Sequence, residues 1–247
     1  MSELSKKNLY LEKAVQALYS DSIPPMRDEN EILITGDRLR RSRLYVPGNQ
    51  PKKILKAGTY SPDCIILDLE DSVPQKEKDN ARIIVRNALR MVDFNGAEKM
   101  VRINSNDTGM IDLEFIIAQN VHVILIPKVE SSDQIIRFVK KINELLKVCG
   151  RREPVFIIPI IESAHGVLNA LEIAKSSPNI IGLTIGLEDY TADLGINKTI
   201  TGEESFFARS MVLHAAKATG IQALDSVHGD FRDEKSLRRS VRESKAL

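Results

Sequence analysis

The sequence predicts a parallel α/β protein of the (β/α)8-barrel type. From residue 38 onward, apolar runs of strand length alternate with helical stretches, and polar or charged residues follow each apolar run. Strands that alternate with helices form right-handed βαβ units, which place the strands parallel to one another in a sheet. The chain has 247 residues, a length at which such barrels routinely form one domain.

The predicted elements follow from these runs in order. Seven apolar runs are expected to be strands: residues 43–46, 64–69, 100–103, 121–126, 155–161, 180–185 and 223–227. The helical stretches between them span residues 50–57, 75–91, 109–118, 132–148, 166–175 and 203–219. After residue 227 the sequence predicts only a loop and a charged helix, so we expect the barrel domain to lack the usual eighth strand.

Residues 1–37 are predicted to form a short N-terminal helical extension, and residues 38–247 the barrel domain. Residues 22–25 would end the helix, whose apolar face is expected to consist of Leu9, Leu11, Val15 and Leu18. The extension carries no motif for chemistry, so a surface helix or an oligomer contact is expected there.

Composition excludes several classes of function. With 35 Lys and Arg against 34 Asp and Glu, the chain has no charge excess of the kind that nucleic-acid binding requires. Cys64 and Cys149 are far apart and lack zinc-ligand spacing, which indicates a reducing compartment. No apolar window approaches the length of a membrane span, and neither dinucleotide, P-loop nor common hydrolase motifs occur. We therefore expect a soluble, cytoplasmic protein.

Acidic residues at the ends of two predicted strands point to a cation site. Glu162 ends the apolar run 155–161, and Glu188 with Asp189 ends the run 180–185. Because the carboxyl ends of parallel strands meet at one edge of a sheet, Glu162 and Asp189 are expected to converge on one divalent cation. Oxygen ligands without thiolate or paired histidine favour Mg²⁺, with Mn²⁺ as the alternative. Such a site suits chelation of a 2-keto carboxylate. A helix-terminal charge or a salt bridge is the competing interpretation of Glu162.

Other strand ends add a cation and further acids. Arg102 supplies a planar cation suited to a carboxylate or to a developing enolate oxygen. Asp68, Glu70 and Asp71 form a crowded acidic cluster, for which a functional role is favoured over a structural one. Lys128 has two interpretations: a Schiff-base lysine or, as we expect, a salt-bridge partner of Glu130 or of the acidic cluster.

Six strand-end motifs, in order, resemble the citrate lyase β-subunit-like branch of the HpcH/HpaI aldolase/citrate lyase family. The motifs are RSRLYVPG (41–48), ILDLEDSV (66–73), VRIN (101–104), IPKVE (126–130), IESAHG (161–166) and GLEDYTADLG (186–195). The resemblance runs from about residue 38 to residue 231. Members of the family usually continue into an eighth strand and a C-terminal lid, so the resemblance implies that this sequence lacks the lid as well. It implies a TIM barrel that binds Mg²⁺ and makes or breaks a carbon–carbon bond in a 3-hydroxyacyl thioester.

The resemblance also implies roles for individual residues. These are metal ligation by Glu162 and Asp189, substrate binding by Arg41, Arg102 and Glu162, and catalysis by Glu70, Asp71 and Arg102. The branch of the family that cleaves unesterified 2-keto acids has a histidine where Asp71 stands, so the thioester branch is favoured. The implied reaction removes a hydroxyl proton, breaks the adjacent carbon–carbon bond and releases an acetyl thioester enolate that is reprotonated.

The function expected from the resemblance is cleavage of citryl-CoA, or of a citryl group on a carrier, into a 2-keto acid and an acetyl thioester. The expected partners are the acyl-CoA or acyl-carrier thioester, the 2-keto acid and further copies of the chain in a trimer or hexamer, with other lyase subunits as additional candidates. Two alternatives stay open. One is a weak or inactive barrel that serves as a subunit or binding partner, and the other is a related acyl-CoA thioesterase or 2-keto-acid aldolase.

Overall fold

The computed structural model describes residues 3–27, 35–199, 201–230 and 232–247. The chain divides into two compact units, which we describe separately. The first comprises Met1–Ile126 and Arg137–Ile157, and the second comprises Pro127–Ile136 and Ile158–Leu247. The predicted division into residues 1–37 and 38–247 stays a prediction, and residues 1–2 and 28–34 of the predicted extension lie outside the described part.

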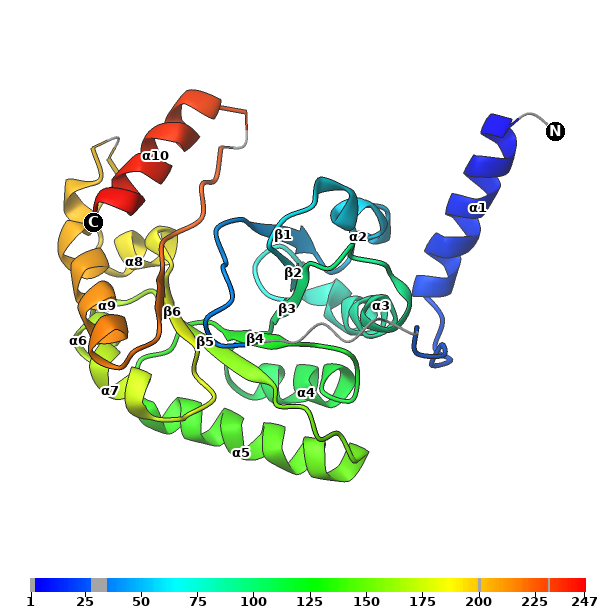
Figure 1. Cartoon of the computed structure of the whole chain (residues 1–247), viewed down its shortest axis with the longest axis horizontal. Helices are drawn as coiled ribbons and strands as arrows, with labels where there is room; N and C mark the ends of the chain where they lie inside the picture. Colours follow the sequence, from blue (N-terminus) through cyan, green and yellow to red (C-terminus); the bar gives the residue numbers. More distant parts are fainter. Residues whose placement is uncertain (1–2, 28–34, 200, 231) are drawn as a thin grey trace. The chain divides into compact units, whose positions relative to one another are not determined.

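The first unit contains a parallel sheet in sequence order (Figure 1). Its strands are β1 (Arg43–Pro47), β2 (Cys64–Asp68), β3 (Glu98–Arg102) and β4 (Val123–Ile126). In the register of the sheet, Pro47 lies beside Asp68, and Asp68 lies beside Arg102. Since β2 is buried along its whole length, its run of apolar residues is that of an interior parallel strand. The register brings the polar residues at the ends of β2 and β3 together.

Helices accompany these strands in the first unit (Figure 1). They are α1 (Glu3–Leu18), α2 (Pro51–Ala57), the 3₁₀ turns Gly58–Tyr60 and Gln75–Glu77, α3 (Lys78–Met91) and α4 (Asn106–Ile116). Helix α1 packs against α2 and α3. Leu18 is fully buried whereas Leu9 is exposed, so only part of the predicted apolar face of α1 is covered by the rest of the unit.

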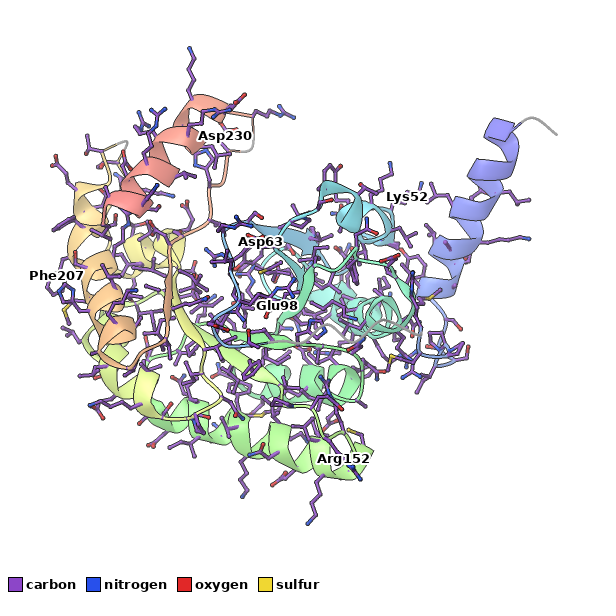
Figure 2. All side chains as sticks on the ribbon, viewed as in Figure 1. Lys52, Asp63, Glu98, Arg152, Phe207 and Asp230 are labelled. Carbon is purple, nitrogen blue, oxygen red and sulfur yellow. The ribbon has the colours of Figure 1, made fainter. Side chains whose placement is uncertain are left out.

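A buried ion pair lies at the start of the sheet in the first unit. Arg40 donates two hydrogen bonds to Glu98, from Nε to Oε2 at 2.7 Å and from Nη2 to Oε1 at 2.8 Å. Both side chains are fully buried, and Glu98 lies in the interior of the unit (Figure 2). The Cys64 thiol, also buried, donates to Glu98 Oε2 at 3.4 Å. Burial and the nearby Glu98 carboxylate raise the pKa of Cys64, which makes this thiol an inert core group.

The second unit contains the remaining strands, again parallel and in sequence order. They are β5 (Phe156–Ile161), whose first two residues belong to the first unit, β6 (Gly182–Ile185) and β7 (Gln222–Leu224). The accompanying helices are α6 (Ala164–Leu168), α7 (Ala170–Lys175), α8 (Leu187–Asp193), α9 (Phe206–Ala218), which the 3₁₀ turn Glu203–Ser205 precedes, and α10 (Glu234–Ala246). Helix α9 packs against β6, β7, α6 and α7 (Figure 1). Helix α5 (Ser132–Cys149) begins in this unit and continues in the first.

Within the described ranges, the seven predicted strands are confirmed, and no predicted end differs from the observed one by more than three residues. The predicted helix over residues 166–175 is two short helices, α6 and α7, which meet at Asn169. Helix α8 was not predicted, because the apolar run into Glu188 and Asp189 resembled a continuing strand. In the described part of the chain, no helix combines the length and the apolar character that crossing a membrane requires.

Candidate active site

The first candidate cluster is built on adjacent strand ends of the first unit. Arg102, the last residue of β3, donates from Nε to Asp68 Oδ1 at 2.6 Å and from Nη2 to Asp68 Oδ2 at 2.7 Å. This bidentate geometry follows from the register, which makes the two residues neighbours across the sheet. Burial raises the pKa of Asp68, but the hydrogen bond and charge of Arg102 outweigh it and hold that pKa below its usual value. Both groups are therefore charged at neutral pH.

Two more acids approach the same guanidinium. Arg102 Nη1 lies 2.8 Å from Glu70 Oε2 and 3.1 Å from Asp71 Oδ2. Glu70 is buried, whereas the Asp71 side chain is 56% exposed. Arg102 Cζ also lies 5.4 Å from the centre of the Tyr45 ring, a cation–π contact. The structure thus brings together Arg102, Glu70 and Asp71, and it adds Asp68 as the residue that orients the cation.

The turn that carries Glu70 is held by a buried lysine. Lys78 Nζ donates to the carbonyl oxygens of Leu69 at 2.6 Å and of Glu70 at 2.5 Å. Burial lowers the pKa of Lys78, although the carboxylates of Asp68 and Asp112 act in the opposite direction. Because these hydrogen bonds hold the backbone of the turn, Lys78 fixes the position of the Glu70 backbone and thereby helps to position its carboxylate.

The second cluster lies in the second unit, at the end of β5. Glu162 follows β5 directly and is buried. Its Oε1 accepts a hydrogen bond from the Lys128 backbone N–H at 2.6 Å. In the register of β5 and β6, Gly186 falls beside Glu162, and its N–H donates to the Ile161 carbonyl at 3.0 Å. A Cβ atom at Gly186 would approach Glu162 Cβ at 3.0 Å and Glu162 Oε2 more closely still. Gly186 therefore leaves the space that the carboxylate occupies.

Asp189 reaches this cluster from the first turn of helix α8, not from a strand end as predicted. Strand β6 ends at Ile185, and Gly186 is the last residue before the helix. Asp189 Oδ2 lies 3.0 Å from Lys128 Nζ. The sequence predicted Glu130 or the acidic cluster as the ion-pair partner of Lys128, whereas the structure pairs its ammonium with Asp189. Glu188 instead pairs with Lys198 at 2.5 Å.

The donor set of the second cluster fits a hard divalent cation. Glu162 and Asp189 both contact Lys128 and supply carboxylate oxygens only. Asp189 Oδ2 is buried and lies within ion-pair distance of Lys128 Nζ. Among the described residues, no group donates a hydrogen bond to this oxygen. The described residues contain no group of three or more His, Cys, Asp or Glu arranged for a metal. Magnesium needs fewer protein ligands, because it is commonly bound through one or two carboxylates and keeps several waters.

Replacing Gly186 with alanine is expected to displace the Glu162 carboxylate and to weaken Mg²⁺ binding at least about tenfold. The added methyl group would overlap sterically with Glu162, whose Cβ would lie only 3.0 Å away. Calorimetric titration of wild type and variant with Mg²⁺ measures the effect. Gly229→Ala is the matched control, because no atom lies within 4 Å of a Cβ built there. Equal Mg²⁺ affinity in Gly186→Ala and wild type would contradict this role of the glycine.

Arg41 is not brought to the residues with which it was grouped. It precedes β1, and its Nη2 pairs with Asp63 Oδ1 at 2.9 Å, just before β2. Arg102 lies at the opposite, carboxyl end of β3. Since the strands are parallel, the length of a strand separates Arg41 from Arg102. We therefore leave Arg41 out of the proposed site.

Sequence reasoning missed the positioning roles of Asp68 and Gly186. Asp68 was predicted as one of three crowded acids, but its pairing with Arg102 follows only from the strand register. A signal for Gly186 was present, since a glycine at the end of an apolar run marks a close approach of backbone or side chain.

At the end of β7, Asp225 pairs with Arg209 and accepts a hydrogen bond from Ser244 Oγ of α10 at 2.5 Å.

Parallel β/α architecture with carboxylates and an arginine after the strands defines the class of α/β enzymes that handle anionic substrates at their strand ends. The sequence model of the HpcH/HpaI aldolase/citrate lyase family matches residues 41–247 of this chain. The chain belongs to this family.

Similar proteins agree with this assignment. The citrate lyase subunit beta of Leuconostoc mesenteroides is 39% identical over 213 residues, which cover 84% of this chain and 70% of that protein. The mitochondrial citramalyl-CoA lyase of Mus musculus is 38% identical over 221 residues, 84% of this chain and 65% of that protein. A solved structure of the citrate lyase beta subunit of Mycobacterium tuberculosis, complexed with oxaloacetate and magnesium, has a TM-score of 0.68 and 32% identity, covering 83% of this chain and 86% of that one. The predicted TIM-barrel type of fold and the predicted family are confirmed.

Proposed function

We propose that this protein is a Mg²⁺-dependent carbon–carbon lyase that cleaves a 3-hydroxyacyl thioester of the citryl type into a 2-keto acid and an acetyl thioester. The observation that carries the proposal is the pair of carboxylates, Glu162 and Asp189, placed around Lys128 after β5 and β6. A bound Mg²⁺ would polarise the oxygens of the 2-keto acid half and lower the barrier to breaking the bond beside them.

In this proposal Glu162 and Asp189 hold the metal. Glu162 is prearranged for this task because the Lys128 backbone fixes one of its oxygens and Gly186 leaves space for the other. Asp189 stands on the first turn of a helix, which sets its direction. A ligand pair fixed in this way loses little side-chain entropy when a cation binds.

Arg102 is proposed to bind a substrate carboxylate. Asp68 occupies Nε and Nη2, so the incoming anion must approach Nη1. Of the two acids at Nη1, Asp71 is the more exposed and the more distant. The substrate is therefore expected to displace Asp71 and leave Glu70 in place. Glu70 and Asp71 are the groups that we propose for proton transfer in this cluster.

The reaction balances without an oxidant or reductant. The substrate hydroxyl loses its proton, the carbon–carbon bond beside it breaks, and the electron pair passes to the acetyl thioester as an enolate that takes up a proton. The names of the relatives support this class of reaction: one is a citrate lyase subunit beta and another a citramalyl-CoA lyase. The oxaloacetate and magnesium in the Mycobacterium tuberculosis structure support a 2-keto acid product.

Turnover of citryl-CoA, citramalyl-CoA and malyl-CoA, followed as 2-keto acid release with and without Mg²⁺, tests the proposal. We expect Mg²⁺-dependent cleavage by the wild type and a loss of roughly 100-fold in Arg102→Lys, because a lysine cannot reproduce the bidentate fork. Arg41→Lys is the matched control and should retain wild-type turnover. Hydrolysis of the thioester without 2-keto acid release would identify a thioesterase and contradict the lyase proposal.

Assembly and location belong to the same proposal. We propose a homo-oligomer, with a carrier protein or other lyase subunits as further partners, and a cytoplasmic location. Two of the relatives, from Leuconostoc mesenteroides and Haemophilus influenzae, are subunits of citrate lyase by name, which supports assembly as part of the function. Light scattering of the purified chain measures the oligomeric state directly.

A further inference from the structure

Lys128 touches both carboxylates of the second cluster through different atoms. Its backbone N–H donates to Glu162 Oε1 at 2.6 Å, and its side-chain Nζ lies 3.0 Å from Asp189 Oδ2. The first contact uses a group that any residue except proline supplies. The second depends on the ammonium alone. Substitution of the side chain can therefore remove the contact with Asp189 while the contact with Glu162 is kept.

The backbone of Lys128 is held in an unusual conformation. Its φ angle of 53° lies in the left-handed region, which lysine seldom adopts. The turn after it is fixed by Gln134, whose Oε1 accepts hydrogen bonds from the backbone N–H groups of Glu130 at 2.7 Å and Ser131 at 3.0 Å. Asn169 Nδ2 donates to the Glu130 carbonyl at 2.8 Å. Unfavourable backbone geometry that surrounding contacts enforce is typical of functional sites.

The Lys128 ammonium lies beside Asp189, one of the two carboxylates proposed to bind Mg²⁺. Asp189 Oδ2 is a buried atom that accepts no hydrogen bond among the described residues, so Lys128 Nζ supplies charge but not a hydrogen bond to it. Both side chains are partly exposed, Lys128 at 45% and Asp189 at 40%. An ion pair of this exposure is weak, and a divalent ion at the same oxygen would repel the ammonium.

We propose that Lys128 is a positioning residue that acts as the resident counter-cation of Asp189 in the metal-free protein and gives up this contact when Mg²⁺ binds. The inference rests on the metal site of the proposed function. Lys128 sets how tightly the site binds Mg²⁺, because part of the binding free energy is used to displace the ammonium. The site is thereby kept weak enough to exchange its metal while Asp189 stays oriented in the absence of metal.

Calorimetric titration of metal-stripped protein with Mg²⁺ tests the inference. Lys128→Met is expected to bind Mg²⁺ about two- to fivefold more tightly than the wild type, the factor that loss of an exposed ion pair predicts. Lys128→Gly should behave in the same way. Since glycine adopts a φ of 53° without strain, this second variant does not depend on methionine tolerating the turn. Lys128→Arg keeps the charge and should restore an affinity close to that of the wild type.

Lys198→Met is the matched control. Lys198 pairs with Glu188, which lies in the same turn of α8 as Asp189. This variant therefore removes one positive charge nearby and leaves the contact between Lys128 and Asp189 intact. It should leave the Mg²⁺ affinity within about twofold of wild type. Unchanged or weaker binding in both Lys128→Met and Lys128→Gly, with normal binding by the wild type, would overturn the inference alone. Absence of Mg²⁺ binding by the wild type would overturn the proposed metal site, and this inference with it.

Discussion

Glu162→Gln is expected to weaken Mg²⁺ binding by more than about 100-fold and to reduce lyase turnover accordingly. Glutamine has nearly the same shape and can still accept the hydrogen bond from the Lys128 backbone. It lacks the negative charge that a hard divalent cation requires. The variant should therefore fold normally, and calorimetry with Mg²⁺ together with the 2-keto acid release assay would show the loss.

Glu188→Gln is the control for this experiment. Glu188 neighbours Asp189 on α8 but pairs with Lys198, so its substitution should leave Mg²⁺ affinity nearly unchanged. The assignment of Glu162 to the metal would be refuted if Glu162→Gln lost stability to urea while its Mg²⁺ affinity stayed at the wild-type value. That outcome would make the residue a structural acid that satisfies the turn at Lys128.

Arg40→Met is expected to lower the free energy of unfolding of the first unit by about 3–5 kcal/mol. Arg40 and Glu98 are both fully buried, and each depends on the other for charge balance. Removing the arginine leaves Glu98 in the interior beside the Cys64 thiol, which is a poor hydrogen-bond donor. Equilibrium urea unfolding, followed by circular dichroism, measures the change.

Arg27→Met gives the comparison for an exposed pair. Arg27 pairs with Asp93 at 2.7 Å, and both side chains are about half exposed. Its loss should cost less than about 1 kcal/mol. If the two variants were destabilised equally, burial of the Arg40–Glu98 pair would not be the reason for its contribution. Mg²⁺ affinity should be the same in both folded variants, because neither residue belongs to a proposed site.

The sequence was sufficient to predict the strands because their chemistry is local. Interior parallel strands are continuous apolar runs, and runs such as Cys64–Asp68 end abruptly at charged residues. The positions of Glu162 and Arg102 directly after or at the end of a strand followed from the same pattern. The placement of these residues at strand ends therefore needed no knowledge of distant contacts.

Contacts between strands were not predictable in the same way. Helix α8 begins at Leu187, immediately after Gly186, so the apolar leucine seemed to continue the strand. The pairing of Lys128 with Asp189 joins residues on different turns that only the fold brings together. Arg41 matched a motif, yet motif membership carries no information about which end of a strand a residue occupies.

The bidentate pair of Asp68 and Arg102 is made by the last residues of β2 and β3. Its geometry is set by the register of the sheet and is reinforced by the turn after β2, where the Glu70 backbone N–H and the Ser72 hydroxyl donate to Asp68. Insertions or substitutions beyond that turn can therefore alter which acyl group fits without moving the arginine that we propose binds its carboxylate. In evolutionary terms, such a scaffold would separate recognition of the carboxylate that the substrates share from recognition of the acyl group that differs between them. Related lyases could then diverge in substrate through changes in their loops.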